Sequence, residues 1–85
     1  MRRVVKVAKV EIRCFATLRD LLPFEAKNGV YKYETRKTTI EGIVEELSLP
    51  KDKLHLILKN GVRVELNEPI KDGDRIGLFP PIGGG

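Results

Sequence analysis

The sequence has few of the residues on which several classes of protein depend. It contains one cysteine, one histidine and no glutamine. A single cysteine excludes an internal disulfide framework, so we expect a reducing compartment, the cytoplasm. No run of about 18 or more apolar residues occurs, which argues against a membrane-spanning helix. Charged residues interrupt the apolar positions near the start, which is not expected of a signal peptide.

The scarce reactive side chains also limit the chemistry that we expect. His55 has no second candidate ligand at metal-binding spacing, so we interpret it as a surface residue and expect no metal site. Cys14 lies in an apolar series, which favours a buried structural thiol over a catalytic one. The sequence has no phosphate-binding loop. We therefore expect that the chain binds no cofactor.

What the sequence does contain is typical of one small globular domain. Of its 85 residues, 41% are hydrophobic and 33% are charged, a balance that favours a folded domain over a disordered one. The net charge of +4 favours acidic partners. No basic stripe interleaved with aromatic residues is present, so we expect no nucleic-acid binding and no membrane association.

The first half of the chain predicts two strands, a short helical turn and a helix. Residues 7–15 alternate with period two, and residues 30–35 are rich in β-branched and aromatic side chains. Between them, residues 16–22 predict a short helical turn whose three leucines share a face. Residues 38–41 match a capping box, with Thr38 as the N-cap of a helix that runs to about Leu47. Its apolar stripe consists of Ile40, Ile43, Val44 and Leu47.

The second half predicts a hairpin and a final strand. Asn60-Gly61 between two alternating apolar runs is a strong hairpin signal. The alternation places inward the residues Leu54, Leu56, Leu58, Val62, Val64 and Leu66, and outward His55, Ile57, Lys59 and Arg63. In the last strand, residues 75–79, the outward positions are Arg75 and Phe79.

This order of elements favours the α+β class with a β-grasp (ubiquitin-like) layout. In that layout one helix packs on one face of a mixed sheet of four to five strands, and the first and last strands lie side by side at its centre. We expect the domain to span residues 1–79 and a flexible tail to span residues 80–85. The uncovered face would carry Ile57 and Phe79 with Arg63 and Arg75 nearby, which we interpret as a partner-docking patch; the alternative is two unrelated surface residues.

The tail has the composition of an extended probe. Three glycines follow Pro80, Pro81 and Ile82. Glycine has no Cβ, so such a segment fits where larger residues would clash. Extended, six residues reach roughly 20 Å, enough to enter another protein's active site. The alternative is an ordinary frayed terminus.

Both ends of the chain resemble the MoaD/ThiS family of ubiquitin-like sulfur carrier proteins. Residues 12–21, Ile-Arg-Cys-Phe-Ala-Thr-Leu-Arg-Asp-Leu, resemble the family's first strand and its entry into a helix. Residues 72–85, from Asp-Gly-Asp through Phe-Pro-Pro to the terminal glycines, resemble its ending. The Phe-Pro-Pro element is closest to the small subunit of molybdopterin synthase.

The resemblance implies a carrier and co-substrate, not an enzyme. An ATP-dependent activating enzyme, which uses Mg-ATP, would adenylate Gly85, and a sulfur donor would convert it to a thiocarboxylate. Gly83 and Gly84 would thread the partner's channel, and Phe79, Pro80 and Pro81 would set the direction of the tail. A large catalytic subunit of molybdopterin synthase would receive the sulfur. Alternatives are a protein modifier conjugated to lysines through the same glycine, a carrier for thiamine or tRNA thiolation, and a passive binding module.

Overall fold

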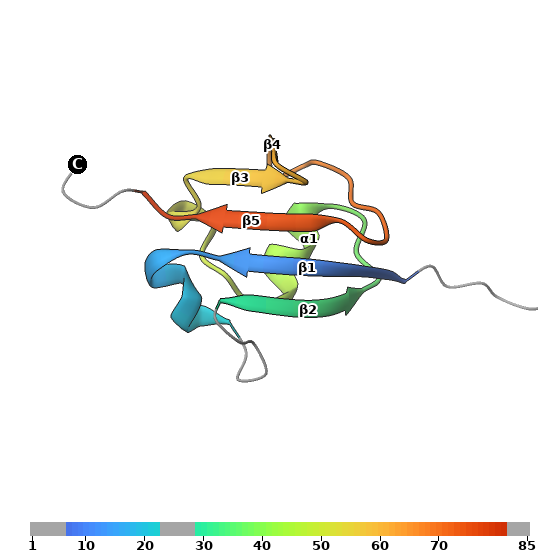
Figure 1. Ribbon diagram of the computed structural model, residues 1–85, viewed down its shortest axis with the longest axis horizontal. Coiled ribbons are helices and arrows are strands. Elements are labelled where there is room, and N and C mark those ends of the chain that lie inside the picture. Colours follow the sequence, from blue (N-terminus) through green and yellow to red (C-terminus); the bar gives the residue numbers. More distant parts are fainter. Residues whose placement is uncertain (1–6, 23–28, 82–85) are drawn as a thin grey trace, which may run out of the picture.

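A five-stranded mixed sheet forms the centre of the protein in the computed structural model, which describes residues 7–22 and 29–81 (Figure 1). The order along the sheet is β2-β1-β5-β3-β4. β1 and β5 are parallel neighbours, and the other pairs are antiparallel. The strands are β1 (Ala8–Cys14), β2 (Val30–Thr35), β3 (Leu56–Lys59), β4 (Val62–Arg63) and β5 (Arg75–Phe79). The predicted β-grasp arrangement, with the first and last strands adjacent, is confirmed.

One α-helix, α1 (Ile40–Glu46), covers one face of this sheet. Its N-cap is Thr39, whose hydroxyl accepts a hydrogen bond from the backbone N–H of Gly42 at 3.2 Å. The prediction that Thr38 caps the helix is therefore wrong by one residue. The Thr38 carbonyl instead accepts a hydrogen bond from the N–H of Ile70. A contact with a distant segment thus decides which of two adjacent threonines begins the helix.

The core lies between α1 and the sheet. It contains the predicted alternate residues of the two central strands and the apolar stripe of the helix. The fully buried members include Ile12, Leu18, Ile40, Ile43, Val44, Ile76 and Leu78. No helix among the described residues is long and apolar enough to cross a membrane.

The turn after β1 is a 3-10 helix, η1 (Ala16–Leu21). Leu18 is buried and Leu22 packs against the core, but Leu21 is 46% exposed. The predicted three-leucine face is therefore wrong for Leu21. Leu22 already has extended dihedral angles, so the spacing of a continuing α-helix does not apply. A second 3-10 helix, η2 (Lys51–Lys53), follows α1.

The predicted hairpin is present, but its alternation is the reverse of that expected in β3. Asn60 and Gly61 form the turn with φ angles of 53° and 85°, as a two-residue hairpin loop requires. Ile57 pairs with the core residue Leu78 and is 7% exposed, whereas Val62 is 64% exposed. The placement of Ile57 on the outer face is wrong. Val62 pairs with Lys59 on the helical side, but it is exposed there and does not join the core. The run Leu56-Ile57-Leu58 is apolar on both faces, so its composition did not reveal the register.

Candidate functional site

The face of the sheet opposite α1, here called the open face, carries the residues that surround the base of the tail. Strand pairing aligns Leu56 with Phe79, and Leu58 with Gly77. Along β5, Gly77 and Phe79 alternate with the buried Ile76 and Leu78, which face the helix. Arg63 pairs with Leu58 and lies at the edge of the same face. The open face therefore combines an apolar centre with basic side chains around it.

Two stacked phenylalanine rings form the centre of this surface. The ring centroids of Phe15 and Phe79 are 4.1 Å apart, and the planes differ by 6°. A Cβ built on Gly77 would lie 3.4 Å from the Phe79 ring and 3.6 Å from the Phe15 ring. The two rings thus lie close to Gly77. Phe15 is 39% exposed, so the pair also presents apolar surface to solvent.

Backbone hydrogen bonds hold the end of β5 on both sides. The Leu78 carbonyl accepts from the N–H of Phe15 at 3.1 Å, and the Phe79 carbonyl accepts from the N–H of His55 at 2.8 Å. Pro80 follows and has no N–H with which to extend the ladder. The sheet therefore ends abruptly at Phe79, and the exit point of the tail is fixed between β1 and β3 (Figure 1).

A hollow of about 280 Å³ lies beside the stacked rings. Its lining includes both rings, Leu58, Arg13 and Arg75. Arg13 is paired with Glu11 at 2.6 Å, with both groups on the open face. Arg75 and Arg63 are exposed, and neither forms an ion pair with any residue that the structure describes. Arg75 therefore adds a positive charge to the lining of the hollow, and Arg63 adds one at the edge of the open face.

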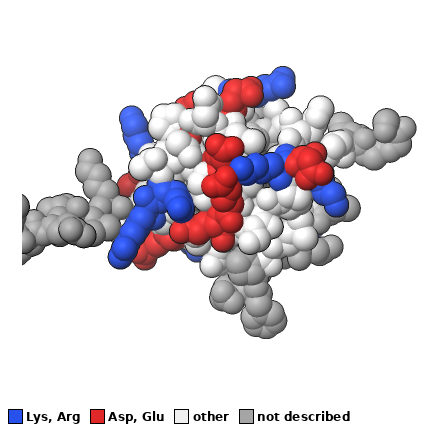
Figure 2. All heavy atoms as spheres, turned by 180° about the vertical axis from the view of Figure 1, so that it is seen from behind, with Lys and Arg blue, Asp and Glu red and all other residues white. Residues whose placement is uncertain are grey.

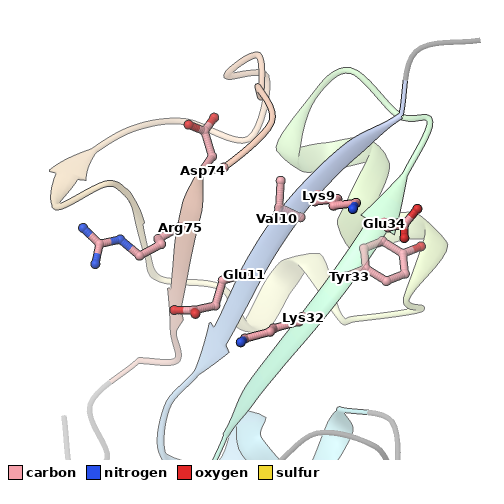
Figure 3. A pocket seen from close by; sticks show the side chains of 9 residues that line it. Lys9, Val10, Glu11, Lys32, Tyr33, Glu34, Asp74 and Arg75 are labelled. Carbon is pink, nitrogen blue, oxygen red and sulfur yellow. The ribbon is translucent and has the colours of Figure 1, made fainter.

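A second, larger hollow of about 460 Å³ lies toward the other end of the open face (Figure 3). Strands β1, β2 and β5 line it with charges of both signs, from Lys9, Glu11, Lys32, Glu34, Asp74 and Arg75. Asp74 is buried, and its carboxylate accepts hydrogen bonds from the Asn60 amide at 2.9 Å and the Lys71 N–H at 2.8 Å. This mixed lining favours neither anionic nor cationic ligands.

On the helical side of the molecule, acidic side chains gather over the centre, with basic side chains among and around them (Figure 2). Glu41 and Glu45 of α1 both pair with Lys51, at 3.2 and 2.5 Å. The hydrogen bond from Lys51 lowers the pKa of Glu45. Hydrogen bonds from Tyr33 and then Thr35 lower the pKa of Glu46. These interactions tie α1 to its surroundings and hold the acidic side chains of α1 on the helical side.

The structure places most of the predicted docking residues together. Phe79, Arg75 and Arg63 lie on the open face, and Pro80 and Pro81 follow directly. Ile57 does not, because it belongs to the core. Lys59 is also on the helical side, where it pairs with Glu68 at 2.7 Å. Gly83, Gly84 and Gly85 lie outside the described residues.

Three residues of the apolar centre were missed from sequence: Phe15, Leu56 and Leu58. Phe15 directly follows the alternating run of the first strand. A parallel pairing of the first and last strands aligns Cys14 with Leu78, so it also brings Phe15 beside Phe79. The sequence predicted that these two strands are neighbours, and the register of their pairing was the missing information.

Two further observations concern the reactive side chains that the structure describes. Cys14 is buried in the core, as predicted, and burial raises its pKa to about 11. Among residues 7–22 and 29–81, no three His, Cys, Asp or Glu side chains are grouped to hold a metal ion.

Comparison with known proteins identifies the family. The ThiS family profile matches residues 2–85. The molybdopterin synthase sulfur carrier subunit of Escherichia coli K12 is 25% identical over 84 residues, which cover 89% of this chain and 99% of that protein.

Solved structures share the fold. Small archaeal modifier protein 1 of Haloferax volcanii superposes with a TM-score of 0.68 at 22% identity, covering 88% of this chain and 99% of that one. In a complex of subunits 1 and 2 of molybdopterin-converting factor from Helicobacter pylori, the matching chain is 26% identical with a TM-score of 0.52, covering 91% of this chain and 99% of that one. The chain therefore belongs to the ThiS family, the ubiquitin-like sulfur carriers that its two ends resemble.

Proposed function

We propose that the chain carries sulfur as a thiocarboxylate on Gly85 and delivers it in the biosynthesis of molybdopterin. Family membership and the 25% identity to the carrier subunit from E. coli support this function. The structural observation that supports it most is the fixed exit of the tail. Phe79 accepts a hydrogen bond from His55, just before β3, and stacks on Phe15, and the proline pair begins immediately after it.

The proposed chemistry needs a partner because a carboxylate is a poor electrophile. An α-carboxyl group has a pKa near 3.5 and is ionised at neutral pH. An oxygen of the Gly85 carboxylate attacks the α-phosphorus of Mg-ATP, and pyrophosphate leaves. Hydrosulfide then attacks the acyl carbon and displaces AMP, which leaves a thiocarboxylate and a proton. The activating partner supplies the nucleotide site and the magnesium ion, and this chain supplies only the acyl group.

We assign the open face as the surface on which the activating enzyme and the sulfur-accepting subunit dock in turn. The stacked rings provide an apolar anchor, and Arg63 and Arg75 favour an acidic rim on the partner. A partner that holds Phe79 receives the tail within about 20 Å of that contact. The H. pylori complex shows that a protein with this fold pairs with a second subunit. We expect the carrier in the cytoplasm, where ATP is available and a free thiol such as Cys14 stays reduced.

Intact-mass spectrometry tests the proposal directly. The mass of the untreated protein first establishes that Gly85 is the last residue. Incubation with Mg-ATP, the activating enzyme and sulfide should then add about 16 Da, and alkylation of the C-terminus distinguishes this gain from oxidation of Cys14 or Met1. A matched variant with one alanine after Gly85 should stay unmodified. An unchanged mass with an activating enzyme that works on its other substrates would count against the proposal.

The same activated glycine permits transfer to a lysine, so a protein modifier is the second candidate. The similarity to the Haloferax modifier protein concerns the fold alone. The second candidate function is retained because both functions use the same activated acyl group. Cell extracts separate the two functions. A carrier should be recovered as free thiocarboxylate that restores molybdopterin synthesis in a mixture depleted of its own carrier. Lysine-linked adducts without such restoration would favour the modifier.

A further inference from the structure

The outer edge of β2 is one boundary of the sheet, and it has no strand beside it among the described residues (Figure 1). β2 pairs with β1 alone, in a register that aligns Val10 with Tyr33. The N–H of Cys14 donates to the carbonyl of Gly29, so hydrogen-bonded pairs of these strands occur at alternate positions counted from that pair. Tyr31, Tyr33 and Thr35 therefore direct their backbone groups toward β1. Lys32 and Glu34 direct theirs outward, to the free edge.

The charges on this edge are complementary to a second copy of the same strand. If two β2 strands meet antiparallel with Tyr33 on the two-fold axis, Lys32 of each copy lies opposite Glu34 of the other. This register brings together the two residues whose N–H and C=O groups face outward, so four backbone hydrogen bonds form. Opposite charges in directly facing positions stabilise the pairing. A register centred on Lys32 or Glu34 would instead place like charges opposite each other.

The aromatic side chains of β2 fit the same arrangement. Tyr31 and Tyr33 lie on the helical side with ring centroids 5.5 Å apart. In Figure 3 the ring of Tyr33 projects beyond β2 on the side away from β1. With Tyr33 on the axis, the two copies of this ring meet at a position without backbone hydrogen bonds, where facing side chains approach most closely. Hydrogen bonds to Glu46 position Tyr33 and Thr35 on the same side.

We propose that the protein forms a two-fold dimer through β2, which joins the two sheets into one continuous sheet of ten strands. The symmetry makes the two β5 strands antiparallel, about 24 Å apart at the usual strand spacing. The tails then leave from opposite ends, and the open faces stay accessible beside them. The dimer is independent of the proposed sulfur chemistry, because its contacts involve neither the tail nor the stacked rings. An interface of one strand pair is small, so the association is weak and reversible.

Charge reversal tests this register. The full-length protein is followed by sedimentation equilibrium over a wide concentration range at low salt. Lys32→Glu and Glu34→Lys each convert two attractive pairs into two repulsive ones, and each should weaken dimerisation about tenfold. The double variant K32E/E34K exchanges the charges and should restore it. An equimolar mixture of the two single variants should form heterodimers, because the first supplies two glutamates and the second two lysines.

Matched controls separate this contact from general effects of charge. Lys53→Glu on η2 makes the same change in net charge as Lys32→Glu, at an exposed position away from β2, and it should leave dimerisation unaltered. Higher salt should weaken the dimer of the parent protein and lessen the difference between it and the single variants. We expect a dissociation constant below about 1 mM for this dimer. A protein that stays monomeric at that concentration overturns the proposal. A dimer that neither Lys32→Glu nor Glu34→Lys weakens also overturns the proposal. The same holds for a monomer whose β2 edge binds only extended peptides of other sequence.

Discussion

Phe15 and Phe79 stack in parallel with their ring centroids 4.1 Å apart, although they come from opposite ends of the chain. The contact joins the residue after β1 to the last residue of β5. It therefore ties the fold to the starting point of the tail. An offset aromatic pair stabilises a protein by about 0.5–1.5 kcal/mol beyond the area that it buries. The same two rings present apolar surface to solvent, so stability and recognition share them.

The first prediction separates these two roles. Phe15→Ala and Phe79→Ala should each lower the free energy of unfolding by about 1–2 kcal/mol, because both rings are only partly buried. A double-mutant cycle from urea denaturation should give a coupling free energy of about 1 kcal/mol. The loss of binding free energy for the activating enzyme, measured by calorimetry, should be larger than the loss of unfolding free energy. Equal losses in both measurements would show that the rings serve only the fold.

The second prediction compares adjacent residues of β3. Ile57→Ala should lower the free energy of unfolding by about 2–5 kcal/mol, because Ile57 belongs to the core. Leu58→Ala should cost about 1 kcal/mol, since its side chain is on the open face and half-buried. Partner binding should respond in the opposite order, with Leu58→Ala more harmful. A more stable Ile57→Ala than Leu58→Ala would contradict the strand register.

The sequence predicted the fold well because each element carries a local signal. The alternation in β1, the stripe on α1 and the Asn60-Gly61 turn depend on neighbouring residues, and together they allow one simple packing. The errors arose where a distant segment decides. Pairing with β5 sets which face of β3 is buried, and the bond from Ile70 to Thr38 shifts the start of the helix.

The candidate site was predictable only in part for the same reason. Phe79 and Arg75 follow from the alternation of one strand and were placed correctly. Phe15, Leu56 and Leu58 reach the site through their register with β5, which local patterns do not reveal. The apolar runs in β3 gave no contrast between its two faces, so Ile57 was chosen in place of its neighbours.

The third prediction concerns the two aspartates that flank Gly73. Asp74 is buried and accepts hydrogen bonds from Asn60 and Lys71, whereas Asp72 is exposed and accepts one from the N–H of Lys9 at 2.7 Å. Asp74→Ala removes a buried acceptor and breaks two part-buried hydrogen bonds, which should cost about 1–3 kcal/mol in unfolding free energy. Asp72→Ala should cost less, because water replaces the lost acceptor. Equal costs from denaturant titrations would contradict this assignment of the two carboxylates.

The fourth prediction concerns the pH dependence of stability above neutrality. Burial raises the pKa of Cys14 from 9.0 to about 11. The folded protein therefore holds this proton more strongly than the unfolded chain. The resulting stability is fully present below pH 9 and is lost as pH rises toward 11, with a slope of at most about 1.4 kcal/mol per pH unit.

Replacing the thiol isolates its contribution to that slope. Burial first, and then Glu46, raise the pKa of Tyr33 from 10.0 to about 12, so this group adds a similar loss that begins above pH 10. Urea denaturation between pH 8 and pH 10 therefore reports mainly on Cys14. Cys14→Ala should be less stable than the parent at pH 8, because it leaves a cavity in the core. Its stability should nevertheless fall less steeply, so the difference between the two proteins narrows with pH. Parallel curves would mean that Cys14 ionises equally in both states, which its burial between the sheet and α1 opposes.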